Sequence, residues 1–92
     1  MSQADAYKLL AAEMQPYRDL SFIELREFAG QRSSRRVTGD DANVYLVDVG
    51  VEWYSRSQDE LIVEGMAALA STGPLRRLDR SFIVSAAGVR AG

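Results

Sequence analysis

The chain has no cysteine and no histidine. Without cysteine it can form no disulfide and has no thiolate nucleophile. Without histidine it lacks the most common general base, the most common zinc ligand and the usual group that titrates near neutral pH. Together the two absences exclude Cys/His zinc sites and the Ser-His and Cys-His pairs of nucleophilic catalysis. We therefore expect no catalytic residues, no metal and no cofactor, and a binding protein is favoured over an enzyme.

A strong net charge and long apolar runs are lacking as well. The 92 residues carry 11 basic and 13 acidic side chains, a net charge of −2, so no overall attraction to nucleic acid or anionic membranes is expected. No apolar run approaches the roughly 20 residues that span a bilayer. The first residues, MSQADAYKLL, do not have the pattern of a secretory signal. These features predict a cytoplasmic protein whose partner is another protein or a second copy of itself.

Two helices are expected before residue 31. The first is expected to start at a cap on Ser2 and to end at Gln15, because Pro16 disfavours helical geometry in the residue before it. Its apolar side chains recur at helical spacing and predict one buried stripe, made of Tyr7, Leu10, Ala11 and Met14.

The second helix is marked by a capping box, in which Ser21 and Glu24 cap each other's backbone amides. Gly30 is expected to close this helix with a left-handed backbone. The expected buried stripe consists of Phe22, Leu25, Phe28 and Ala29.

The stretch GQRSSRRVTGDD, residues 30–41, holds three arginines and two aspartates. A phosphate site would need a glycine-rich loop that leads into a helix N-terminus. This stretch instead leaves a helix C-terminus, where the helix dipole disfavours anions. It is therefore interpreted as a connection and a first edge strand, whose arginines block unwanted strand pairing.

From residue 43 the apolar period changes to two, which predicts antiparallel strands. One face of the strand over residues 43–56 is apolar, and Gly50 within it suggests a bulge or bend and a curved sheet. A second strand is expected over 60–68, a turn over 70–74, and one broken strand or two short ones over 75–78 and 82–84. Residues 86–92 are expected to fray. The inward residues of the first strand are Tyr45, Val47, Val49, Val51 and Trp53.

The expected fold is thus a single α+β domain over residues 1–92. Two N-terminal helices pack on a curved antiparallel meander sheet of three to five strands. The expected interaction surface is the outer sheet face, on the side opposite the helices, and its residues are Glu52, Ile62, Glu64 and Met66. If the apolar residues of that face are contiguous, they indicate a partner surface or a homodimer. If they are scattered, they need no explanation. The strand register decides between these alternatives.

Three further groups of residues were considered. Asp48, Glu52 and Glu64 could cluster and bind a hard cation, although a solvated face whose acids pair with Arg76, Arg77 or Arg80 is favoured. Together with Arg35 and Arg36, the same arginines form only a weak nucleic-acid patch, because Asp79 interrupts it and no aromatic platform accompanies it. Tyr45 and Trp53 could line a ligand pocket between the helices and the sheet, although their place in the inward stripe favours plain core.

The segments DLSFIELREFAG, RRVTGDDANVYLVDVGVEWY and RSFIVSAAG resemble, in this order, a family of small uncharacterised bacterial proteins. The pattern of that family runs as an LSYDEL helix, a VTGPDG turn, a YQVEVQVFWDD strand and a closing DFI-x-x-PDG. The resemblance covers most of residues 19–88. Tyr54 and Ser55 stand where the family has two acids, and an alanine replaces its final acid. Because the family has no established activity, the resemblance supports the fold and supplies no catalytic residue.

Two functional hypotheses follow. The first is a non-enzymatic protein-interaction module that self-associates through the outer sheet face or an edge strand. The alternative is a small-ligand-binding protein or minor enzyme that uses a pocket between helices and sheet.

Overall fold

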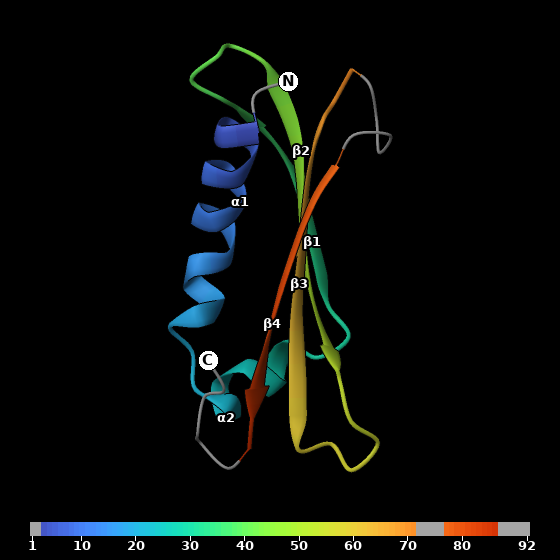
Figure 1. Ribbon diagram of the computed structural model, residues 1–92. Coiled ribbons are helices and arrows are strands. Elements are labelled where there is room, and N and C mark those ends of the chain that lie inside the picture. Colours follow the sequence, from blue (N-terminus) through green and yellow to red (C-terminus); the bar gives the residue numbers. More distant parts are fainter. Residues whose placement is uncertain (1–2, 72–76, 87–92) are drawn as a thin grey trace.

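The computed structural model describes residues 3–71 and 77–86, which form two helices on a four-stranded sheet (Figure 1). The antiparallel strands lie in the order β1-β2-β3-β4, so each pairs with the next along the chain. This confirms the predicted α+β meander, and Figure 1 shows the sheet strongly twisted with α1 along one face. The elements are α1 (Gln3–Arg18), α2 (Phe22–Leu25), the 3₁₀ helix η1 (Arg26–Phe28), β1 (Arg32–Thr38), β2 (Val44–Trp53), β3 (Glu60–Leu69) and β4 (Arg77–Ser85).

Helix α1 continues past the proline that was predicted to end it, so that prediction was wrong. Pro16 lies in the last turn, where the Asp19 amide still donates to the Gln15 carbonyl at 3.2 Å. The turn therefore closes although proline itself has no amide proton to donate. The predicted cap, Ser2, lies outside the described residues.

The buried stripe of α1 also differs from the prediction. Tyr7 is 49% exposed and Ala11 is exposed, whereas Ala6, Leu10 and Met14 are buried. These three residues lie four apart and form one ridge of the helix, which packs against the sheet. Tyr7 and Ala11 lie beside that ridge.

The second helix begins as predicted. The Glu24 amide donates to Ser21 Oγ at 3.2 Å, and the Ser21 amide donates to Glu24 Oε1 at 3.0 Å. The helix is short, because it changes to η1 after Leu25, the one fully buried residue of its predicted stripe. Phe28 is 39% exposed, in contrast to the prediction, and contacts Tyr17 edge-to-face. Gly30 has the predicted left-handed backbone, with φ of +85°.

The core lies between α1, α2 and the sheet. The alternation predicted for β2 is confirmed from Tyr45 to Val51, and Trp53 is half-buried against Phe22. The fully or almost fully buried residues of β2 and β3 on this side are Tyr45, Val47, Val49, Val51, Leu61, Val63 and Ala67.

Gly50 does not form the predicted bulge, because it pairs in an unbroken register with Arg32 and Glu64. Its role is to leave room for a neighbouring side chain. A Cβ atom at Gly50 would lie 2.5 Å from Nη1 of Arg32, whose side chain lies over Gly50 and binds Asp48 of the same strand at 2.9 Å.

The last strand, β4, is continuous from Arg77 to Ser85 and is not broken as predicted. The polar residues Asp79 to Ser81 interrupt the apolar pattern but not the ladder to β3. Residues 72–76 and 87–92, which include most of the predicted turn and the predicted frayed tail, lie outside the described residues. No helix in the described part of the chain is long and apolar enough to cross a bilayer.

Candidate functional site on the outer sheet face

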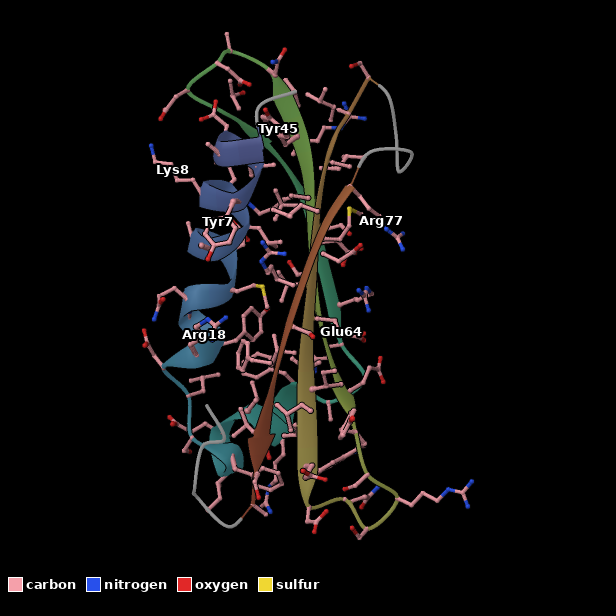
Figure 2. All side chains as sticks on the ribbon, viewed as in Figure 1. Tyr7, Lys8, Arg18, Tyr45, Glu64 and Arg77 are labelled. Carbon is pink, nitrogen blue, oxygen red and sulfur yellow. The ribbon has the colours of Figure 1, made fainter. Side chains whose placement is uncertain are left out.

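The strand register shows which side chains share the face opposite α1. The helices cover the other face, and Figure 2 shows Glu64 and Arg77 projecting from the sheet away from α1. Four rows of paired residues cross the outer face: Arg36–Leu46–Ala68–Arg77, Ser34–Asp48–Met66–Asp79, Arg32–Gly50–Glu64–Ser81 and Glu52–Ile62–Ile83. The four residues predicted from the sequence, Glu52, Ile62, Glu64 and Met66, all lie on this face.

The apolar residues of the outer face form two patches. The Leu46 patch consists of Leu46, Met66, Ala68 and the neighbouring Val44. Val44 is 39% exposed, whereas Ala68 is only 1% exposed although it lies on the face away from the helices. The Ile62 patch consists of the directly paired Ile62 and Ile83. The row that contains Gly50 and Glu64 separates them. The sequence left open whether these residues are contiguous or scattered, and the register shows two clusters.

The charges of this face are only partly paired. Arg32 binds Asp48 at 2.9 Å and Arg77 binds Asp79 at 3.1 Å. Arg36 and Glu52 take part in no ion pair within the described ranges 3–71 and 77–86. Arg36 pairs with Leu46 across the strands, and Glu52 pairs with Ile62. Each apolar patch therefore has an unpaired charge beside it, and the two charges are opposite.

The three acids considered as a cation site share the outer face but lie on different rows. Asp48 is opposite Met66, Glu64 is opposite Gly50, and Glu52 is opposite Ile62. Asp48 is already bound to Arg32. Among the described residues, no group of three or more acidic side chains could hold a metal ion. The arrangement is that of a charged sheet face with local ion pairs.

Tyr45 and Trp53 lie on the helix side of β2, at its two ends. They are eight residues apart, which corresponds to about 26 Å along a strand. The Tyr45 side chain is fully buried, and its hydroxyl donates to Asp41 Oδ2 at 2.6 Å. This bond and those from Asn43 lower the pKa of Asp41 from 3.8 to about 2. The two aromatic residues are too far apart to line one small-molecule site.

The sequence analysis missed a cleft between α1 and β4. It placed Arg80 among the arginines that pair with outer-face acids, but Arg80 lies on the helix side, over the Tyr7 ring at 5.0 Å. Arg18 lies over the Phe82 ring at 4.3 Å. The sequence held a signal for this position. Arg80 is an even number of residues from Leu78, Phe82 and Val84, which face the helices, and such residues share one face of a strand. Arg76 lies outside the described residues.

No protein-family model, curated protein or solved structure matches the chain. The resemblance to the family of small uncharacterised bacterial proteins therefore stays a prediction drawn from the residues.

Proposed function

We propose that this protein is a non-enzymatic interaction module that forms a homodimer through the outer face of its sheet. The observation that carries the proposal is the pair of half-buried apolar patches on the outer face, each beside a charge, Arg36 or Glu52, that forms no ion pair within the described residues. Isolated apolar residues on a surface need no partner, but clustered ones rimmed by charges are typical of protein interfaces. We also propose a cytoplasmic location, as expected from the sequence.

The charges favour one arrangement of the two copies. If a twofold axis lies between the sheets and perpendicular to the strands, the strands of the two copies run antiparallel and the Leu46 patch covers the Ile62 patch of the second copy. Arg36 of each copy then lies near Glu52 of the other. Two such ion pairs and two apolar contacts form one self-complementary interface.

Two other arrangements are disfavoured by charge. A twofold axis parallel to the strands would place Arg36 of one copy opposite Arg77 of the other, and like charges across an interface repel. Pairing through the edges would bring together strands that carry Arg32, Arg35 and Arg36 on β1, and Arg77 and Asp79 on β4. Charged side chains on an edge strand oppose such pairing.

The substitution Ile62→Lys tests the proposal, because it places a charge in the centre of the Ile62 patch. Light scattering should show a dimer for the wild type at both low and high salt, and a monomer for Ile62→Lys. The matched control is Ile23→Lys on α2, since Ile23 is 65% exposed and distant from the outer face. The control should remain dimeric. An unchanged mass for Ile62→Lys would eliminate this face as the interface.

A further inference from the structure

The cleft between α1 and β4 has a volume of about 230 Å³ and lies on the helix side of the sheet. It is lined mainly by Tyr7, Leu10, Ala11, Met14, Arg18 and Arg80. The proposed dimer would cover the opposite face and leave this cleft open. Figure 2 shows Tyr7 and Arg18 on the same helix, at different heights along it.

Two arginines reach across the cleft in opposite directions. Arg80 extends from β4 to the Tyr7 ring of α1, and Arg18 extends from α1 to the Phe82 ring of β4. Stacking on an aromatic ring holds the plane of a guanidinium in place and leaves its N–H edge available. Both guanidiniums are therefore held at the mouth of the cleft.

Neither arginine binds a carboxylate in the part of the chain that the structure describes. Arg80 Nη1 donates to the backbone carbonyl of Asp79 at 2.9 Å. A guanidinium has five N–H donors, so most of its donors remain for another acceptor. By contrast, the described arginines Arg32, Arg35 and Arg77 each bind an acidic side chain. Two guanidiniums that bind no carboxylate within the described residues line the same cleft, and this favours an anionic ligand.

The floor of the cleft is apolar. Its exposed apolar lining is Tyr7 and Ala11, and beneath them lie Leu10 and Met14, which are 0% and 1% exposed. The volume is below the roughly 300–1,000 Å³ of most ligand pockets, which limits the ligand to a small molecule. We propose that the cleft binds a small carboxylic acid with an apolar body, whose carboxylate is held by Arg18 and Arg80 and whose body lies on Tyr7 and Ala11, next to the buried Met14.

Octanoate is a suitable probe, with octanol as its uncharged counterpart. The methyl groups of Met14 and Met66 report on the two faces by NMR, because Met14 lines the cleft and Met66 lies on the outer face. Octanoate should shift the Met14 methyl signal and leave that of Met66 unchanged. Octanol should bind at least tenfold more weakly, since it lacks the charge-assisted hydrogen bonds. No shift of Met14 with octanoate, or an equal response to octanol, would overturn the proposal.

Three variants and one control locate the site. Arg18→Gln and Arg80→Gln should each weaken octanoate binding about tenfold, the loss expected for one charge-assisted hydrogen bond. Ala11→Phe fills the cleft from an exposed helix position and should abolish the Met14 shift. Arg56→Gln, in the β2–β3 loop, makes the same change of charge far from the cleft and should bind octanoate like the wild type. If Arg56→Gln weakened binding as much as the cleft variants, the anion would be attracted by general charge and the proposed site would be wrong.

Discussion

At the scale of single residues, Asp41 organises the turn between β1 and β2. Its carboxylate accepts hydrogen bonds from the Tyr45 hydroxyl at 2.6 Å and from the side chain and backbone of Asn43 at 3.0 and 3.1 Å. Tyr45 is fully buried, and this bond gives its hydroxyl a charged acceptor. The turn is thus linked directly to the core.

The substitution Tyr45→Phe should make the stability of the protein less dependent on pH in the acid range. Hydrogen bonds lower the pKa of folded Asp41 from 3.8 to about 2, and the one from Tyr45 is the largest cause. A depressed carboxyl pKa stabilises the fold above the unfolded value, and this contribution is lost as pH falls through the folded value. Tyr45→Phe should therefore have a lower free energy of unfolding than the wild type near pH 6. The difference between the two free energies should narrow between about pH 4 and pH 2.

Urea unfolding of both proteins at several pH values measures this gap. The packing of the ring is nearly the same in both, so its contribution cancels to first order. A gap that stays constant down to pH 2 would show that the hydroxyl contributes without acting on the ionisation of Asp41.

At the scale of elements, the position of α1 on the sheet depends on one glycine of β3. A Cβ atom at Gly65 would lie 2.7 Å from Sδ of Met14 and 2.8 Å from Cδ1 of Leu10. Both of these side chains are buried against the sheet. The absence of a side chain at Gly65 therefore allows the close approach of helix and strand.

Gly65→Ala should destabilise the protein by about 1–3 kcal/mol, the usual range for overpacking a core. Gly50→Ala is the matched comparison, because its Cβ would also overlap a side chain, that of Arg32. Arg32 is exposed and can move, and its ion pair with Asp48 is partly solvated. We therefore expect a loss below about 1 kcal/mol for Gly50→Ala. Chemical denaturation measures both values, and equal losses would contradict the explanation for Gly65.

Most of the elements could be predicted because their signals are local. The capping box at Ser21, the left-handed Gly30 and the alternation along β2 each depend on residues close in sequence. Most of the errors concern features that depend on distant residues, and the end of α1 is a local exception. The role of Gly50 depends on Arg32, which lies on another strand, and no local pattern reveals that contact. Pro16 was misinterpreted because a proline in the last turn leaves the next hydrogen bond intact.

At the scale of the whole molecule, the sheet has two different sides. Alternation along β3 placed Ile62, Glu64 and Met66 on the outer face before any register was known. It could not show that Leu46 and Ile83 complete the two patches, because those neighbours come from β2 and β4. The alternation of β4 already assigned Arg80 to the helix side, but it could not show that Arg18 lines the same cleft. Arg18 and Arg80 are far apart in sequence, and only the packing of α1 beside β4 brings them to one cleft.

The central claim is that two copies associate with Arg36 of one near Glu52 of the other. The most direct test is the solution mass, measured by light scattering over a range of concentrations, of the wild type, Arg36→Glu, Glu52→Arg and the double variant. The wild type should be a dimer, and each single reversal should weaken it about tenfold or more by placing like charges together. The double variant exchanges the two charges and should restore the dimer. A monomeric wild type, or the same mass for all four proteins, would contradict the proposed interface.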